Sequence, residues 1–161
     1  MEHKAHAEIQ TGHKGHYKKL LIMAVLSFIA MYILMYAMVN NIHNVYSNIN
    51  QFYMAALMTM PMVVIELLLM SKMYTNKKLN RILLAAGTVG AIGFLLLIQH
   101  QTGVSDKQFL KGMIPHHAAA ILMSEQSKSE DPEIQKLQQE IISSQREEIR
   151  LMKVKLKELE R

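Results

Sequence analysis

The chain has 161 residues, of which 50% are hydrophobic and only 19% are charged. That balance is typical of a membrane protein, and the absence of cysteine excludes disulfides and thiolate metal sites. The net charge of +5 lies entirely before Ser105, because basic and acidic residues balance from there on. We therefore expect no phosphate-binding stripe in the C-terminal part and no nucleic-acid partner.

The first nineteen residues are rich in lysine and histidine, with glycines at positions 12 and 15. His3, His6, His13 and His16 form two pairs at a spacing of three, which would chelate a divalent metal on a helix. The glycines favour a disordered cytoplasmic tether instead. We predict a tail over residues 1–19 and leave its metal role open.

Three apolar runs follow, over residues 20–39, 52–70 and 82–98. Each is long enough to cross about 30 Å of hydrocarbon, so the sequence predicts a three-span transmembrane domain over residues 20–98. The basic residues of this region lie in the tail and in the loop 71–81, whereas the loop 40–51 carries no Lys, Arg, Asp or Glu. The positive-inside rule then predicts a cytoplasmic N-terminus and a periplasmic or extracellular C-terminal domain over residues 105–161 of a bacterial inner membrane protein.

Two amphipathic helices are predicted in the C-terminal domain. Ser105 and Gln108 fit a capping box for the first, which runs to about Lys128 and is either restarted or kinked at Pro115. Asp131 as N-cap and Pro132 begin the second, which we extend to about Leu159. Its expected apolar stripe comprises Ile134, Leu137, Ile141, Met152, Leu156 and Leu159.

Histidine and methionine recur on one face of the first of these helices. Helical spacing groups Met113, His116, His117 and Met123 in one broad stripe with the small residues Ala120 and Ser124. Imidazole suits several transition metals, and a thioether specifically suits Cu(I), so the mixture indicates copper. The alternative is that the methionines are core residues and the histidines are satisfied polar groups.

On the second helix, Gln145 and Glu148 interrupt the apolar stripe near its centre. A carboxylate on a core face is costly unless it is paired or bound to a metal, so we expect Gln145, Glu148 and Met152 to face His116 and His117. They would serve as ligands or as partners that orient an imidazole. The alternative is that Glu148 pairs near the surface with Arg146, Lys153 or Lys155.

The run Met113-Ile114-Pro115-His116-His117, the following alanines, and the second helix with Gln145, Glu148 and Met152 resemble the family catalogued as domain of unknown function 305. The resemblance covers about residues 105–161. It implies a ferritin-like helical bundle and an association with copper binding and copper tolerance outside the cytoplasm.

The expected fold is all-α: three transmembrane helices followed by an extracytoplasmic αα-hairpin. A hairpin this small buries little on its own, so we expect a homodimer that completes a four-helix bundle. The predicted function is a membrane-anchored copper-binding protein, with Cu(I) or another transition metal held by residues drawn from Met113, His116, His117, Met123, Glu148 and Met152.

Two other functions stay open. A metal-ion transporter would use Glu66 and the regularly spaced methionines of the second span, Met54, Met58, Met62, Met70 and Met73. A purely structural oligomerising protein would need no metal at all. We expect no enzymatic activity, because a di-iron centre wants Glu-x-x-His motifs and the C-terminal domain has none.

Overall fold

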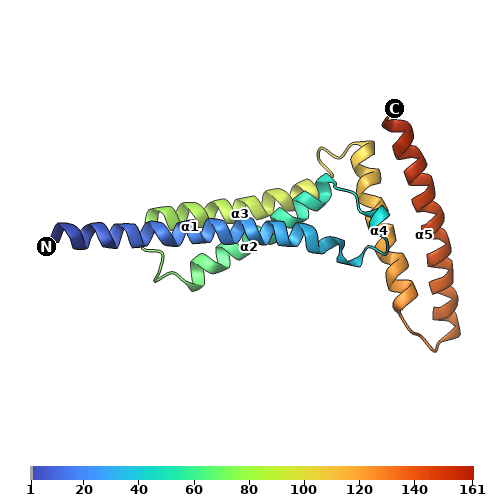
Figure 1. Cartoon of the computed structure of the whole chain (residues 1–161), viewed down its shortest axis with the longest axis horizontal. Coiled ribbons are helices and arrows are strands. Elements are labelled where there is room, and N and C mark those ends of the chain that lie inside the picture. Colours follow the sequence, from blue (N-terminus) through green and yellow to red (C-terminus); the bar gives the residue numbers. More distant parts are fainter. Residues whose placement is uncertain (1) are drawn as a thin grey trace. The chain divides into compact units, whose positions relative to one another are not determined.

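A computed structural model of the chain describes residues 2–161, with side chains from Gly15 onward. Over that part the structure is helical and contains no strand (Figure 1). The prediction of a disordered tail differs from the structure, since the first helix begins at Glu2. His3, His6 and His13 lie outside the described side chains. The elements are α1 (Glu2–Leu34), η1 (Met35–Met38), η2 (Ile42–Asn44), α2 (Ile49–Leu69), α3 (Lys77–Gln99), α4 (Asp106–Gln126) and α5 (Pro132–Leu159).

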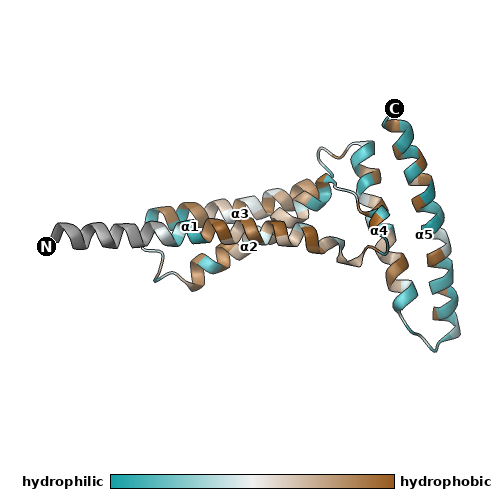
Figure 2. Cartoon of the chain, in the orientation of Figure 1, coloured by the Kyte–Doolittle hydropathy of each residue, from teal (hydrophilic) through white to brown (hydrophobic). Residues whose placement is uncertain are grey.

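Three helices in the described part are long and apolar enough to cross a membrane. Their bounds are Gly15–Met38, Ile49–Leu69 and Lys77–Gln99, and their apolar character is visible along α1, α2 and α3 (Figure 2). The second and third begin earlier than the predicted runs, because the helices continue through polar residues that flank the apolar segments. The number of candidate spans agrees with the prediction.

The chain divides into two compact units, and the division differs from the predicted domains. Unit 1 comprises Met1–Tyr32 and Tyr53–His100, and unit 2 comprises Ile33–Phe52 and Gln101–Arg161. The loop 40–51, which the sequence assigned to the transmembrane domain, thus belongs with α4 and α5. Hydrogen bonds and apolar contacts to α4, described below, account for this.

Unit 1 is built on close helix contacts at glycine. A Cβ atom added at Gly87 of α3 would lie 2.8 Å from Cγ2 of Val64 on α2, and one added at Gly90 would lie 3.1 Å from the sulfur of Met60. The same atom at Gly93 would meet nothing within 4 Å. At two of these three positions, glycine therefore allows α2 and α3 of one chain to approach closely.

Three methionines of the second span are exposed in unit 1. Met54, Met58 and Met70 are 39–44% exposed, whereas Ala55, Ala56 and Thr59 on the same helix are buried. Glu66 is partly buried, and its Oε1 accepts a hydrogen bond of 3.2 Å from the Tyr74 hydroxyl. These three methionines therefore lie at the surface of unit 1.

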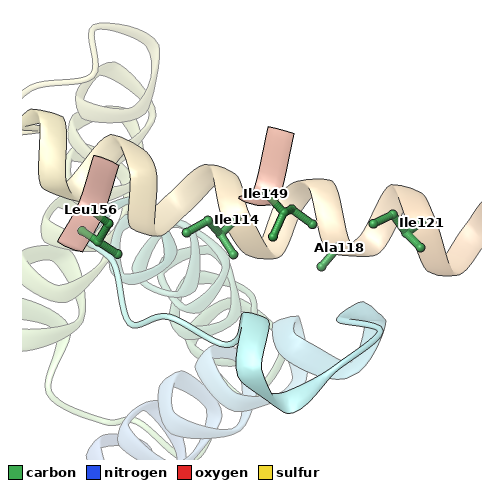
Figure 3. Close-up of a cluster of buried hydrophobic side chains, with 5 residues drawn as sticks. All are labelled: Ile114, Ala118, Ile121, Ile149 and Leu156. Carbon is green, nitrogen blue, oxygen red and sulfur yellow. The ribbon is translucent and has the colours of Figure 1, made fainter. Parts of the chain in front are cut away.

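Unit 2 has its core between α4 and α5, which lie side by side (Figure 1). Ile114, Ala118 and Ile121 of α4 form a row that meets Ile149 and Leu156 of α5 (Figure 3). The segment that precedes α2 adds to this core, because Val39 and Tyr46 pack against the same cluster, as do Leu110 and Met152.

The bounds of α4 and α5 lie close to the predicted ones, but the capping of α4 differs from the prediction. Ser105 is the N-cap residue of α4 but its side chain makes no capping bond, so the predicted capping box with Gln108 is wrong. Pro115 lies inside a continuous helix that ends at Gln126. Asp131 caps α5 by accepting from the backbone N–H of Glu133 at 2.8 Å, with Pro132 in the first turn.

The buried face of α5 agrees only in part with the predicted stripe, of which Leu156 is buried and Met152 packs against the core. Ile142, Ile149 and Leu156, seven residues apart, are the buried residues of this helix. Ile134, Leu137 and Leu159 are 43–54% exposed. The predicted stripe included apolar residues that do not share one face. A repeat of seven residues keeps the same side of a helix against its neighbour.

Candidate metal site

The candidate site lies beside the α4–α5 core. On α4, Ala118 is buried against α5, so the preceding residue His117 lies at the margin of the core and His116 points further outward. The side chain of His117 is only 14% exposed, whereas His116 is an exposed residue. The two rings remain neighbours, with centroids 6.3 Å apart. The sequence pattern made no distinction between the two histidines, whereas packing leaves His117 partly buried and His116 exposed.

His117 contacts the carboxylate of Glu148 on α5. Its Nδ1 lies 2.9 Å from Oε2 of Glu148 and is otherwise buried without a hydrogen-bond partner. The short distance makes this a polar contact that an adjustment of the ring would convert into a hydrogen bond. The expected juxtaposition of His117 and Glu148 is therefore present in unit 2.

Glu148 lies at the edge of the core and not on its buried face, since its side chain is 47% exposed. Nε2 of Gln145 donates to Glu148 Oε2 at 3.4 Å. Two of the three alternative partners of Glu148 pair elsewhere: Arg146 with Glu125 at 2.7 Å and Lys155 with Glu158 at 2.7 Å. The carboxylate is thus directed to the histidine and the amide.

Burial lowers the pKa of the His117 imidazole below its ordinary value of 6.5. The Glu148 carboxylate opposes this shift, and the neighbouring His116 adds to it. The net direction is downward, so the ring is neutral at pH 7. A neutral imidazole is the form that binds a metal ion.

The methionine candidates lie in different surroundings. Met113 is partly buried one helical turn before His117. Met123 is 53% exposed, two turns further on. Met152 packs against the core cluster, which gives its thioether a structural role.

An open hollow of about 280 Å³ adjoins this part of α4. Ala120 and Ser124, the small residues of the predicted histidine and methionine stripe, contribute to it. It is lined by Ala120, Met123, Ser124, Ser127, Gln138 and Ile141.

Among the described residues, no group of three or more histidine, aspartate or glutamate side chains is arranged to hold a metal ion. His117 and Glu148 are two such residues that lie in contact.

Sequence reasoning missed the polar contacts that fix α4 to the segment before α2. Gln108 Oε1 accepts a hydrogen bond of 2.8 Å from the backbone N–H of Ile49. The buried Asn48 accepts from the N–H of Gln51 at 2.9 Å, which caps α2, and its amide lies 3.5 Å from the carbonyl of Lys111. The asparagines of the loop 40–51 could have indicated these polar contacts, because asparagine side chains often cap helices.

The fold and site define an all-helical protein with three helices able to span a membrane and a separate helical unit that carries a His117–Glu148 pair. The chain belongs to the family described as Domain of unknown function (DUF305), which it matches over residues 54–156. That match begins within α2, so the family extends well beyond the residues 105–161 on which the resemblance rested.

One similar relative is the Uncharacterized protein L153 of Acanthamoeba polyphaga mimivirus. It is 36% identical over 137 residues, which cover 83% of this chain and 88% of the relative. No solved structure matches the chain.

Proposed function

We propose that this protein is a membrane-anchored copper-binding protein whose C-terminal unit holds Cu(I) for sequestration or delivery. The observation that carries the proposal is the His117–Glu148 contact at 2.9 Å, with the imidazole Nδ1 buried and the opposite ring nitrogen left to act as a ligand. A carboxylate that accepts from one ring nitrogen is the usual way in which proteins orient a metal-binding imidazole. Glu148 thereby becomes a positioning residue, and Gln145 holds the carboxylate in turn.

The donors that complete the site are sulfur and a second imidazole. Met113 lies one turn from His117 on the same helix, and His116 adjoins it. This set of one or two imidazoles with thioethers favours Cu(I) over harder ions, which prefer oxygen. Met123 and Met152 are the remaining candidates, and Met152 ranks last because it packs against the core.

The proposal also includes the side of the membrane on which unit 2 lies and its dimerisation. The lysine and arginine bias supports a cytoplasmic N-terminus and an extracytoplasmic unit 2, where a thiol-free copper site is suited to an oxidising compartment. Exposed apolar residues on α5, including Ile134, Leu137 and Leu151, support an αα-hairpin that dimerises into a four-helix bundle. A second copy placed there would also add donors to a site that has few of its own.

The test is a Cu(I) titration of the full-length protein in detergent against a competing chelator, repeated with Zn(II). The full chain is needed because the segment Ile33–Phe52 is part of unit 2, so a fragment beginning at Ser105 would lack part of its fold. We expect Cu(I) to bind more tightly than Zn(II), and His117→Ala to lose most of the Cu(I) affinity. His43→Ala, at an exposed position of η2, is the matched control.

Equal Cu(I) affinity in the wild type and in His117→Ala would contradict the proposed site. The transporter alternative makes a separate prediction, since its residues lie in unit 1. If Met58→Leu and Glu66→Gln abolished copper movement across vesicles while His117→Ala had no effect, transport through the membrane helices would replace binding by unit 2 as the function.

A further inference from the structure

A cluster of basic side chains lies at one end of unit 1, and the copper proposal does not use it. Lys18 and Lys19 of α1 and Lys77, Lys78 and Arg81 of α3 are all exposed. Among the residues whose side chains the structure describes, none of these five forms an ion pair, and Glu66 is the one acidic residue of unit 1 in that range. Within the side chains that the structure describes, no ion pair therefore offsets the mutual repulsion of these five charges.

Hydrogen bonds bring the two halves of this basic cluster together, although about sixty residues separate them in the sequence. The Tyr17 hydroxyl donates to Asn80 Oδ1 at 2.6 Å, and the same hydroxyl accepts from the backbone N–H of Asn76 at 3.2 Å. Asn80 in turn donates to the carbonyl of Tyr74 at 2.6 Å, and the rings of Tyr17 and Tyr74 are 5.2 Å apart. The residues next to Tyr17 and Asn80 in the chain are Lys18 and Arg81, so the basic residues of α1 and α3 are held near each other.

A bound anion would also stabilise the start of α3. Its first turn contains Lys77 and Lys78 and no acidic residue, although the N-terminus of a helix carries partial positive charge. Lys77 and Arg81 are one turn apart on the same side of the helix, where like charges destabilise each other. An anion between α1 and α3 would relieve both effects.

Exposed apolar residues border the basic cluster on both helices. Leu21 and Ile22 follow the lysines of α1 and are 65% and 46% exposed, and Ile82 follows Arg81 and is 54% exposed. A ligand that fits charged and apolar surface together carries an anionic group on a hydrocarbon chain. That combination favours a phospholipid over free phosphate or nucleic acid, neither of which would cover the apolar residues.

We propose that Lys18, Lys19, Lys77, Lys78 and Arg81, held together by the Tyr17–Asn80 hydrogen bond, bind the phosphodiester headgroup of an anionic phospholipid, whose acyl chains lie along α1 and α3. The basic end of the three helices thereby selects anionic lipid from the surrounding membrane. This interaction is independent of metal binding by unit 2.

The experiment measures lipid binding to the full-length protein in a neutral detergent by native mass spectrometry, with phosphatidylglycerol and phosphatidylcholine as probes. We expect phosphatidylglycerol to bind at least tenfold more tightly. Lys77→Gln/Arg81→Gln is expected to weaken that binding by roughly 30-fold, since each basic residue near a membrane surface contributes about fivefold. Lys136→Gln/Lys153→Gln on α5 removes the same charge and is expected to leave lipid binding unchanged.

Two further arms test the built site and its ligand. Tyr17→Phe keeps every charge but removes the link to Asn80, so weaker phosphatidylglycerol binding by this variant supports a defined site. Wild-type binding by Tyr17→Phe, or equal effects of the α3 and α5 double variants, would show a diffuse charge effect and overturn the proposal. Displacement of the lipid by an equal concentration of inorganic phosphate would also overturn it, because the acyl chains would then contribute nothing.

Discussion

Gln108 on α4 accepts a hydrogen bond of 2.8 Å from the backbone N–H of Ile49, fifty-nine residues earlier in the chain. The first turn of a helix has N–H groups without intrahelical partners, and Ile49 begins α2. A side chain of unit 2 therefore satisfies a donor at the start of a membrane-type helix. The contact lies close to the buried Asn48, so the two amides together fix α4 against the segment that precedes α2.

Removal of either amide should destabilise unit 2. We expect Gln108→Ala and Asn48→Ala each to lower its free energy of unfolding by about 1–2 kcal/mol, because each leaves backbone N–H groups without a partner. Gln139→Ala, an exposed residue of α5, is the control and should change stability by less than about 0.5 kcal/mol. Urea denaturation followed by protease sensitivity of unit 2 measures the difference. Equal behaviour of all three variants would show that the contacts carry no stability.

Two glycines of α3 should respond in opposite ways to the same substitution. Gly87→Ala places a methyl group 2.8 Å from Cγ2 of Val64, and that short, branched side chain cannot move away easily, so we expect a lower thermal unfolding midpoint for the detergent-solubilised protein. Gly93→Ala meets nothing within 4 Å and should leave the midpoint unchanged or raise it, because alanine favours a helix by up to about 1 kcal/mol. A Gly87→Ala protein as stable as Gly93→Ala would contradict the close approach of α2 and α3.

The α4–α5 core should be sensitive at Ile149 and not at Leu151. Ile149 is 7% exposed and packs in the central cluster, whereas Leu151, two residues later, is 49% exposed. Ile149→Ala is expected to cost about 2–5 kcal/mol, which would unfold so small a unit, and Ile149→Val about 0.5–1.5 kcal/mol. Leu151→Ala should cost far less. Limited proteolysis of the folded protein ranks the three variants, and the reverse order would mean that the helices pack through another face.

Acid should weaken unit 2 through His117. Its folded pKa lies below the ordinary value of 6.5, so the unfolded chain takes up the proton first as pH falls. The stability that this group contributes is complete above pH 6.5 and is lost as pH falls from there to the lower folded pKa. Denaturation of the metal-free protein at pH 7.5 and at successively lower pH values should show this decline, and His117→Gln should remove it. A decline of the same size in the variant would assign it to other groups.

The positioning role of Glu148 can be separated from a general charge effect. If the carboxylate orients His117, Glu148→Ala should weaken Cu(I) binding by roughly 10–100-fold, the usual effect of losing a group that orients a metal ligand. Glu147→Ala is the matched control, because Glu147 is the adjacent residue and pairs with Arg150 at 2.6 Å instead. Equal Cu(I) affinities for the two variants would remove Glu148 from the site.

The elements were predictable from the sequence because their signals are local. A charge-free run of twenty residues marks a membrane-type helix, and Asp131 followed by Pro132 marks a helix start whatever the rest of the chain does. The Met-Ile-Pro-His-His run likewise indicated the family, which the match over residues 54–156 shows. Each of these inferences depends only on residues that are close together in the sequence.

Tertiary packing decided what local patterns leave open. By sequence the two histidines were equivalent ligand candidates, and the burial of Ala118 against α5 placed His117 beside Glu148 and left His116 exposed. Gln108 carried the pattern of a capping residue, but its partner proved to be the distant N–H of Ile49, because a side chain bonds to whichever donor the fold brings near. The sequence by itself determined which helices form, and only the tertiary structure decided which side of each helix is buried, since that depends on residues far away in the chain.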